Sequence, residues 1–392
     1  MKDVKNIDFY KKICNNKYME KIGILGGTFD PVHLEHVRLA KCAIEELALD
    51  KLFVMPTFIP PHKSVLPTDS KERLEMLTLA FSGLDKVVVS DFEIQKQGKS
   101  YTYQTVEYFK QNYNAQIYFI CGGDMLTDFR TWRYPERILN ACDLAVFGRE
   151  DFFTDYDKEK EYFEKTFNKS FIKLNYVGKS LSSTKIRVYS AFNLNVDEVT
   201  MPQVANYIKE KNLYKADKYV KFITDNLPEK RIRHTANVVI TALKRAKELG
   251  LDQEKVRITA TLHDCAKYID HTRVEGFTLP SDVPSPVVHA FLGAFIAEKV
   301  LGVTDDEILD AIRYHTSGKA KMTTLGKLIF VADMVEEDRV YQGVEQLRTL
   351  YESADFEDCF VQCLKEEFIH LLNKKQRIYE ETLNAFSYYV KE

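Results

Sequence analysis

Residues 21–36 read KIGILGGTFDPVHLEH, and this stretch decides the fold of the first half of the chain. The apolar run at 21–25 predicts a short β-strand that ends in the turn Gly26-Gly27. Residues 34–48 then show helical spacing, with an apolar stripe formed by Val37, Ala40, Ile44 and Leu47. A strand that passes through glycines into a helix presents free N–H groups and the positive end of the helix dipole, which favour a bound phosphate.

The alternation of strand and helix continues along the first half. Strand-like runs follow at 52–55, 86–89, 117–121, 144–147 and 171–177, with helical patterns between them, for example at 70–82 and 102–112. This alternation predicts a parallel sheet with helices on both faces, in which ligands bind at the carboxyl ends of strands, where Gly26 and Gly122 lie. Residues 150–170 predict a loop or a peripheral helix, and the helical pattern at 201–214 closes the unit.

The pattern changes after Lys215, where long amphipathic stretches replace the alternation. They cover 216–226, 232–249, 253–268, 287–301, 304–315, 324–335 and 356–388. Nothing there alternates with period two, so the second half predicts an all-helical domain. We therefore divide the chain into an N-terminal extension at 1–19, an α/β domain at 20–214 and a helical domain at 216–392. Met19 is an alternative start, which leaves open whether residues 1–18 are translated.

The composition is typical of a globular protein in the cytoplasm. The chain of 392 residues has a net charge of −3, with 45% hydrophobic and 29% charged residues. This near-neutral charge gives no argument for nucleic-acid binding, and no apolar run approaches the length that spans a bilayer. Seven cysteines without a CxxC pair indicate reduced thiols. We therefore expect a cytoplasmic protein without nucleic-acid or membrane partners, and we leave open whether it forms a homo-oligomer.

Two segments of the first half carry residues suited to phosphate. His33 and His36 stand three positions apart, so both face one side of the first helical turn and can donate to phosphate oxygens. The segment LSSTKIR at 181–187 offers hydroxyls that can cap a helix, and it adds the cations Lys185 and Arg187. Each segment alone also fits an ordinary capped turn, but two of them in one α/β domain favour a phosphate site.

Together these segments resemble the nucleotidyltransferase superfamily, which has a Rossmann-like fold with HxGH and SSTxIR motifs. The details are most similar to nicotinate-nucleotide adenylyltransferases, through PTFIPPHK at 56–63, GKSYTYQT at 98–105, CGGDMLTDFRTW at 121–132 and FGR at 147–149. The resemblance covers about residues 20–214. It implies that ATP, with Mg²⁺ on its triphosphate, transfers its adenylyl group to nicotinate mononucleotide, giving deamido-NAD and pyrophosphate. Nicotinamide mononucleotide is the rival acceptor.

The resemblance also implies roles for individual residues. Around ATP it places Gly26, Gly27, Thr28, Phe29, His33, His36, Arg149, Ser183, Thr184 and Arg187, with the two histidines as catalytic groups. Thr102, Asp124 and Trp132 would hold nicotinate mononucleotide, with the tryptophan stacked on the pyridine ring. His62 and Lys63 would lie near phosphates. Glu35 departs from the family, whose HxGH has glycine there, because a carboxylate near a triphosphate is unfavourable unless it points away or toward Mg²⁺.

The second half carries a set of metal-type ligands, which are His234, His263, Asp264, His289, His315 and Asp333. The steps between successive ligand positions are 29, 25, 26 and 18 residues, with His263 and Asp264 counted as one position. Imidazoles with carboxylates suit divalent metals that hold a water, and such sets are common in phosphate-ester hydrolases because the metal lowers the pKa of that water. Burying the adjacent His263 and Asp264 beside Ala260 and Leu262 requires a charge partner, which a metal supplies.

This set resembles the HD-domain phosphohydrolase superfamily. The segments RIRHTANV at 231–238, LHDCAK at 262–267, HAFLGA at 289–294, YHTSG at 314–318 and FVADMVEEDR at 330–339 are similar to bacterial symmetrical diadenosine tetraphosphatases. The resemblance covers about 216–392 and implies a dinuclear centre of iron or another divalent metal that cleaves diadenosine tetraphosphate into two ADP.

By this second resemblance, His234, His263, Asp264 and Asp333 would be core ligands, and His289 and His315 would complete the second metal or bind phosphate. Asp264 would also act in catalysis, by bridging metals or orienting the water. Lys267, Thr316 and Arg339 would neutralise phosphate oxygens.

The leading hypothesis is therefore a bifunctional enzyme, an α/β Rossmann-like nucleotidyltransferase followed by an all-α HD phosphohydrolase. Two alternatives stay open for the helical half. It could be a nucleotide-sensing regulatory module, although a sensor need not keep a complete ligand set. It could also hydrolyse a different substrate, such as a deoxynucleoside triphosphate, a cyclic dinucleotide or a nucleoside monophosphate.

Overall fold

The computed structural model describes residues 19–59, 67–150, 152–353, 355–375 and 377–390. These residues form two compact units. The first unit extends to Ser183 and includes Asp197–Tyr207, and the second contains Thr184–Val196 and the chain from Ile208. A division into compact units does not test where one family's domain ends and the next begins. The predicted domain boundary near residue 215 therefore stays a prediction.

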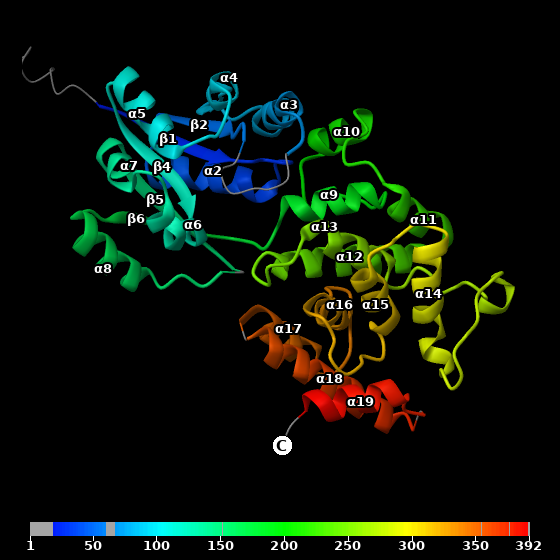
Figure 1. Ribbon diagram of the computed structural model, residues 1–392. Coiled ribbons are helices and arrows are strands. Elements are labelled where there is room, and N and C mark those ends of the chain that lie inside the picture. Colours follow the sequence, from blue (N-terminus) through cyan, green and yellow to red (C-terminus); the bar gives the residue numbers. More distant parts are fainter. Residues whose placement is uncertain (1–18, 60–66, 151, 354, 376, 391–392) are drawn as a thin grey trace, which may run out of the picture. The chain divides into compact units, whose positions relative to one another are not determined.

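The first unit is built on a six-stranded parallel sheet. Its strands are β1 (Glu20–Gly27), β2 (Lys51–Pro56), β3 (Val87–Val89), β4 (Ala115–Gly122), β5 (Asp143–Arg149) and β6 (Phe171–Gly178). The strand order is β3-β2-β1-β4-β5-β6, so the order reverses between the neighbouring strands β1 and β4, which are labelled in Figure 1. Ligands of such sheets bind at this switch point, beyond the carboxyl ends of the strands. The predicted α/β Rossmann-like class is confirmed.

Helices connect the strands of this sheet, and two more helices follow its last strand. They are α2 (Leu34–Glu46), α3 (Ser70–Phe81), α4 (Phe92–Lys96), α5 (Thr102–Asn112), α6 (Gly123–Asp128), the 3₁₀ turn η1 (Phe129–Thr131), α7 (Pro135–Ala141), α8 (Tyr156–Phe167), α9 (Ser183–Ala191) and α10 (Pro202–Glu210). The predicted helices α2, α3 and α5 are present. For residues 150–170, where the sequence predicted a loop or a peripheral helix, the structure has the helix α8. The helices α4, α6 and α7 were not predicted, because five to seven residues are too few to show helical periodicity.

The second unit is helical in its described residues, as predicted. It contains α9 from Thr184 onward. Its further helices are α11 (Lys218–Asn226), α12 (Glu229–Ala246), α13 (Gln253–Leu262), α14 (Val288–Lys299), α15 (Asp306–Tyr314), α16 (Thr324–Val335), α17 (Val344–Ser353), α18 (Phe356–Asn373) and α19 (Glu380–Tyr389), with the 3₁₀ turns η2 (His271–Arg273) and η3 (Ser285–Val287). No helix among the described residues is long and apolar enough to cross a membrane.

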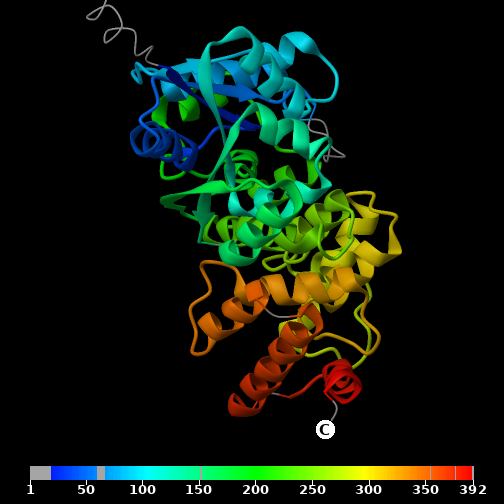
Figure 2. The ribbon, with the colours of Figure 1, turned by 90° about the vertical axis from the view of Figure 1, so that its left-hand side faces the viewer.

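Two predicted stretches of the second half need correction. The stretch 356–388 divides into α18 and α19, which pack against each other at the orange and red end of the chain (Figure 2). Lys375, between them, has a φ of 52°, a left-handed conformation that an α-helix cannot continue. The helix predicted at 253–268 ends at Leu262, and His263 and Asp264 begin the series of turns that follows. Helix α17 was not predicted.

Helix α16 organises the interior of the second unit. Eight of its twelve residues are buried, and it packs against α12, α15, α17 and α18. Asp333 lies near its carboxyl end, while His234 lies on α12 beside it. The packing of these two helices therefore brings together ligands that are 99 residues apart in the sequence.

Candidate functional sites

The first candidate site lies where β1, β4 and β5 end. Leu25 pairs with Ile120 and Gly122 pairs with Phe147, so the glycines that end β1 and β4 reach the same edge of the sheet. A Cβ on Gly122 would lie 2.3 Å from Asp124 Oδ1, so a larger residue there would require the Asp124 carboxylate to move. This edge combines closely approaching backbone with the amino-terminal end of α2, the combination that suits phosphate.

His33 and His36 form a tightly packed pair at the start of α2. Their rings stack with centroids 3.6 Å apart, and Phe29 meets His36 edge-on at 4.8 Å. The backbone N–H of His33 donates to His36 Nδ1 at 3.1 Å. The neutral ring of His36 must therefore carry its proton on Nε2, where it is a hydrogen-bond donor. His33 Nδ1 is buried without a hydrogen-bond partner among the described residues, so it remains available to a ligand.

Both rings are neutral at pH 7. Burial lowers the pKa of His33 to about 4, against the opposing charge of Glu35. Burial, with smaller contributions from His33 and Arg149, also holds the pKa of His36 well below its usual value. A neutral imidazole can still donate its N–H, so the pair offers hydrogen bonds rather than positive charge. The positive charge at this edge comes from Arg149, at the end of β5.

The LSSTKIR segment is divided between the two units. The Ser183 hydroxyl donates to the Pro31 carbonyl at 2.7 Å, which fastens the first residue of α9 to the loop after β1. Thr184 and Arg187 follow on α9 and belong to the second unit, where Arg187 Nη2 donates to Thr184 Oγ1 at 3.1 Å.

The residues expected around the acceptor nucleotide lie on several elements. Arg149 Nη1 is 3.4 Å from Asp124 Oδ2, so an ion pair joins the end of β5 to the first turn of α6. Trp132 is half-buried, and its ring lies 5.9 Å from Phe119 and 5.1 Å from Phe129. Thr102 begins α5. The remaining expected residues, His62 and Lys63, lie outside the described residues.

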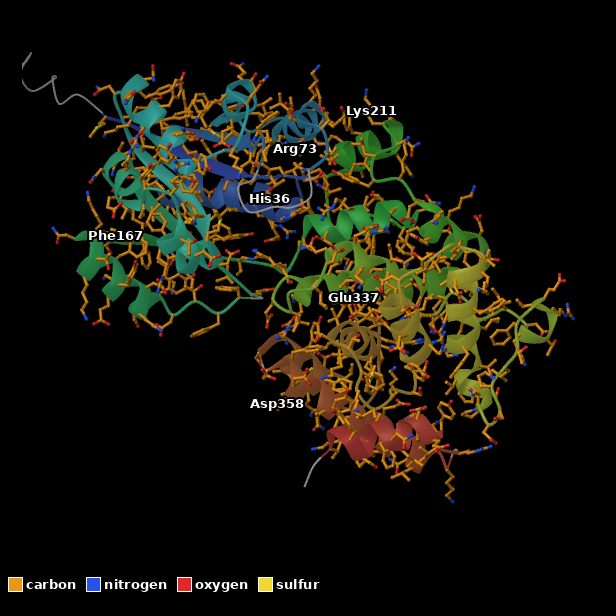
Figure 3. The ribbon with its side chains drawn as sticks, viewed as in Figure 1. His36, Arg73, Phe167, Lys211, Glu337 and Asp358 are labelled. Carbon is orange, nitrogen blue, oxygen red and sulfur yellow. The ribbon has the colours of Figure 1, made fainter. Side chains whose placement is uncertain are left out.

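Sequence analysis missed Arg73, a buried arginine on α3 (Figure 3). Its Nη1 donates to the carbonyls of Thr28 at 2.8 Å and Thr57 at 2.7 Å, and its Nε donates to that of Thr68 at 2.8 Å. The side chain therefore holds the loops after β1 and β2 in place. A charged residue on the apolar stripe of the predicted helix 70–82 was the available signal, since that stripe also contains Met76, Leu77 and Ala80.

Glu35 is engaged away from the end of β1. It is buried, and it accepts hydrogen bonds from the Tyr176 hydroxyl, from Arg38 and, at 2.9 Å, from the backbone N–H of Lys179. Burial favours the neutral acid, but these hydrogen bonds hold the pKa of Glu35 below its usual value. The charged carboxylate is therefore satisfied by the end of β6 and the turn that follows it.

The second candidate site gathers all six expected metal ligands. His234 lies on α12, His289 on α14 and Asp333 on α16, while His263 and His315 cap the carboxyl ends of α13 and α15 and Asp264 follows His263. Three groups of these residues have ligand atoms within 4.8 Å of one another. The groups are His234, His263 and Asp264; His263, His315 and Asp333; and Asp264, His289 and His315.

Hydrogen bonds orient the imidazoles toward the centre of this cluster. Nδ1 of His263 lies 2.7 Å from the Ala260 carbonyl, and Nδ1 of His315 lies 2.8 Å from that of Ile312. A ring that donates from Nδ1 presents its Nε2 lone pair, the usual arrangement of a metal-binding histidine. Asp264 Oδ1 is buried without a well-oriented hydrogen bond from any described residue, although His289 Nε2 is 3.0 Å away. Converging lone pairs and carboxylates repel one another, so this donor set fits a divalent cation.

The protonation states also suit metal binding. Burial opposes the charged forms of both aspartates, but the nearby imidazoles of His289 and His315 hold the pKa of Asp264 well below its usual value, and Arg339 and His234 do so for Asp333. Burial lowers the pKa of His263 to about 3. Ionised carboxylates and neutral imidazole are the ligand forms that bind metals.

His234 behaves differently from His263. Despite burial, hydrogen bonds to Asp333 and Glu336 raise the pKa of His234 to about 8. Its Nε2 lies 3.1 Å from Asp333 Oδ1 and its Nδ1 lies 3.0 Å from Glu336 Oε1. A proton on Nε2 therefore competes with a metal ion for this position.

The polar residues expected around the phosphates lie at the edge of the cluster. Lys267 Nζ is 3.4 Å from Asp264 Oδ1, Thr316 Oγ1 is 3.0 Å from His315 Nε2, and Arg339 pairs with Asp333. Sequence analysis missed Arg231, whose Nη1 lies 3.2 Å from Asp264 Oδ2. It also missed the buried Glu336, which the sequence does not distinguish from the exposed Glu337 beside it.

The fold and the two residue sets define a nucleotidyltransferase joined to an HD domain. Residues 24–188 match the cytidylyltransferase-like family, and residues 231–338 match the HD domain. A probable nicotinate-nucleotide adenylyltransferase of Clostridium botulinum (strain Alaska E43 / Type E3) is 39% identical over 201 residues, which are 51% of this chain and 100% of the relative. The chain belongs to the nicotinate-nucleotide adenylyltransferase family and carries an HD domain in its second half.

Other relatives extend the similarity beyond the first half. A probable nicotinate-nucleotide adenylyltransferase/Ap4A hydrolase of Mycoplasma genitalium is 28% identical over 328 residues, covering 82% of this chain and 88% of the relative. The crystal structure of a protein from Clostridium acetobutylicum, described as a predicted HD superfamily hydrolase involved in NAD metabolism, is 31% identical. It covers 44% of this chain and 95% of that chain, with a TM-score of 0.42. Relatives named for two activities support bifunctionality in broad terms.

Proposed function

We propose that the chain is a bifunctional enzyme with two nucleotide substrates. Its nucleotidyltransferase half transfers the adenylyl group of ATP to nicotinate mononucleotide, giving deamido-NAD and pyrophosphate. Its HD half hydrolyses diadenosine tetraphosphate (Ap4A) to two ADP. The Mycoplasma relative that shares most of the chain is named for these two activities, which supports both assignments.

The adenylyl transfer needs alignment and charge stabilisation but no covalent intermediate. A phosphate oxygen of the mononucleotide attacks the α-phosphorus of ATP, and the bond to pyrophosphate breaks. The backbone N–H groups after Gly26 and the amino-terminal end of α2 would hold the phosphates, and His36 would donate its Nε2–H to an oxygen that gains charge. Mg²⁺ would arrive with the triphosphate. The observation that carries this proposal is the neutral histidine pair at the end of β1, in which His33 Nδ1 remains available.

The remaining residues of this site would bind the two nucleotides. Arg149, Ser183, Thr184 and Arg187, together with Thr28 and Phe29, would surround ATP. Thr102, Asp124 and Trp132 would hold the acceptor, and His62 and Lys63 would contact phosphates. Nicotinamide mononucleotide is the competing acceptor, because these residue types do not distinguish a carboxylate from an amide.

The metal ions of the hydrolytic site would be held by Asp264 together with the four histidines and Asp333. Asp264 Oδ1 lies 3.0 Å from His289 Nε2 and 3.4 Å from His315 Nε2, while Asp264 Oδ2 lies 3.9 Å from Nε2 of both His234 and His263. One carboxylate that faces two histidine pairs supports a dinuclear centre, of iron or another divalent metal. Bound divalent ions polarise a phosphoryl group and lower the pKa of water. Lys267, Thr316 and Arg339 would neutralise phosphate oxygens of the substrate.

Product analysis of the purified full chain tests both assignments. The protein is given ATP with each mononucleotide, and separately Ap4A and other nucleotides, and products are separated by chromatography while metals are measured in the same sample. We expect deamido-NAD with pyrophosphate, two ADP per Ap4A, and about two metal ions per chain, as a dinuclear centre requires. An HD half that binds metal but hydrolyses none of these nucleotides would instead be a sensing module. Faster transfer to nicotinamide mononucleotide would overturn the choice of acceptor.

A further inference from the structure

Helix α9 is held to the second unit by a network of hydrogen bonds. Lys185, from the LSSTKIR segment, lies with its Nζ 2.6 and 2.8 Å from the two carboxylate oxygens of Glu337. One helical turn further on, the Tyr189 hydroxyl lies 3.0 Å from Glu337 Oε1 and 2.8 Å from Asn237 Oδ1. The network therefore joins α9 to α12, which carries Asn237, and to the segment that follows α16.

The same network continues to a metal-type ligand. Asn237 Nδ2 donates to Glu336 Oε2 at 3.1 Å, and Glu336 Oε1 lies 3.0 Å from His234 Nδ1. His234 belongs to one of the three candidate ligand groups. An unbroken path of side-chain contacts within the second unit thus connects Lys185 on α9 with the cluster.

The geometry leaves little freedom in this path. Asn237 donates from its amide nitrogen to Glu336, so its oxygen must face Tyr189. Arg348 fixes the segment around Glu336, with its Nε 2.9 Å from the Val335 carbonyl and its Nη2 2.8 Å from that of Arg339. The Tyr189 hydroxyl has one proton for two acceptors, so its donation to Asn237 competes with its donation to Glu337. A small displacement at either end can therefore be transmitted through this hydroxyl.

We propose that Tyr189 and Glu336 are positioning residues through which the metal centre and α9 constrain each other, so that filling the metal centre lowers the KM for ATP in adenylyl transfer. The proposal rests on the proposed function, because α9 carries Thr184 and Arg187, which are assigned there to ATP. Coupling between two binding events is reciprocal and commonly amounts to a fivefold effect or more. Packing alone would hold α9 in place but would not make ATP binding depend on the metal.

The experiment measures KM for ATP and kcat in the full chain, first loaded with Mn²⁺ and then stripped with a chelator, under excess Mg²⁺. Mg²⁺ prefers oxygen ligands, so it should not replace the metal in a histidine-rich cluster. We expect stripping to raise KM for ATP about fivefold in the natural protein, with kcat nearly unchanged. Tyr189→Phe keeps the ring and removes the hydroxyl, and should reduce this response to less than about twofold.

The matched control is Tyr351→Phe. The hydroxyl of this buried tyrosine donates to the Thr241 carbonyl of α12 at 2.7 Å, so the variant also loses one hydroxyl hydrogen bond to α12. It should keep the full response to metal. An equal response in Tyr189→Phe and the natural protein would overturn the coupling, as would a natural protein whose KM does not change on stripping.

Metal retention provides a readout that needs no nucleotide. In a chelator titration followed by elemental analysis, Tyr189→Phe should lose Mn²⁺ at about threefold lower chelator concentration than Tyr351→Phe. The reason is that metal affinity usually falls when the hydrogen-bond partner of a metal-binding histidine, here Glu336 beside His234, is held less firmly. Equal retention in the two variants would overturn the network. If adenylyl transfer is absent from every protein, the proposed function fails, and the retention result still decides whether the network positions His234.

Discussion

The two candidate sites differ in how the chain supplies their residues. Much of the first site comes from one continuous stretch, 26–36, whereas the ligands of the second come from five helical segments that are 18 to 29 residues apart. The first offers backbone N–H groups and a neutral histidine pair. The second offers ionised carboxylates and imidazoles that face one another. A local site depends on the shape of one turn, while a convergent site depends on helix packing and on a balance of charge.

This difference predicts opposite consequences for stability. Removing a side chain from the first site should cost activity but little stability, because the turn is held by its backbone and by Arg73. Removing a ligand from the second should also cost the stabilisation that a bound metal gives to the folded state. The following substitutions test this contrast, from the largest expected effect to the smallest.

Asp264→Ala should have the largest effect, because the carboxylate of Asp264 faces both histidine pairs. We expect Ap4A hydrolysis to fall by at least about 10⁴-fold, in line with the loss of metal catalysis. Bound metal should disappear and the Tm should fall to that of the stripped natural protein. Product assays, elemental analysis and thermal unfolding check these outcomes. Asp225→Ala, at an exposed aspartate on α11, is the control and should retain all three properties.

His36→Ala should lower adenylyl transfer by about 10²- to 10³-fold, the usual effect of removing one donor that stabilises developing charge. The free energy of unfolding should fall by only about 1 kcal/mol, because the variant loses one hydrogen bond from the His33 backbone. Steady-state kinetics and denaturant unfolding measure the two effects. Hydrolysis and metal content should not change in His36→Ala. The control is His370→Ala, at an exposed position, in which adenylyl transfer, hydrolysis, metal content and stability should all stay unchanged. Near-normal adenylyl transfer would remove His36 from the catalytic groups.

Glu336→Gln should have an intermediate effect on the second site. The side chain keeps its size but loses the charge that faces His234 Nδ1, and the loss of such a partner typically weakens metal affinity 10- to 100-fold. Mn²⁺ affinity in a chelator competition is the measurement. Glu275→Gln, at an exposed glutamate between η2 and η3, is the control. Its Mn²⁺ affinity should stay within about threefold of the natural value.

The same contrast explains which features the sequence could predict. The six strands and the long helices follow from periodicity, and the GGTFDPVHLEH turn is readable because its residues are consecutive. The types of the six metal ligands were also visible, but not their hydrogen bonds to Ala260, Ile312 and Glu336. The carbonyls of Ala260 and Ile312 lie only three residues before the histidines that they contact, whereas the contact between His234 and Glu336 spans 102 residues and depends on tertiary packing. Arg73 and Arg231 were missed for the same reason, since a buried arginine is recognised by the carbonyls or carboxylates that it contacts.

Glu35→Gly should have the smallest effect on activity. It tests whether a charged side chain of the first site contacts the nucleotide. Glu35 is a buried, charged carboxylate that accepts hydrogen bonds from several donors. Buried carboxylates are otherwise typical of the second site, but Glu35 lies in the sequence between the two histidines of the first. Substitution by the glycine of the HxGH pattern leaves the Tyr176 hydroxyl and the Lys179 N–H without this acceptor, and it places glycine in the first turn of α2.

We expect the free energy of unfolding of Glu35→Gly to fall by about 2–3 kcal/mol, from unsatisfied donors and glycine in a helix. The kcat and KM for ATP should stay within about threefold, because the carboxylate points toward the end of β6. Glu35→Gln keeps an acceptor of the same size and should lose less stability. If KM for ATP instead changes tenfold in Glu35→Gly while stability is kept, Glu35 contacts the nucleotide, and the first site then uses charged side chains as the second does.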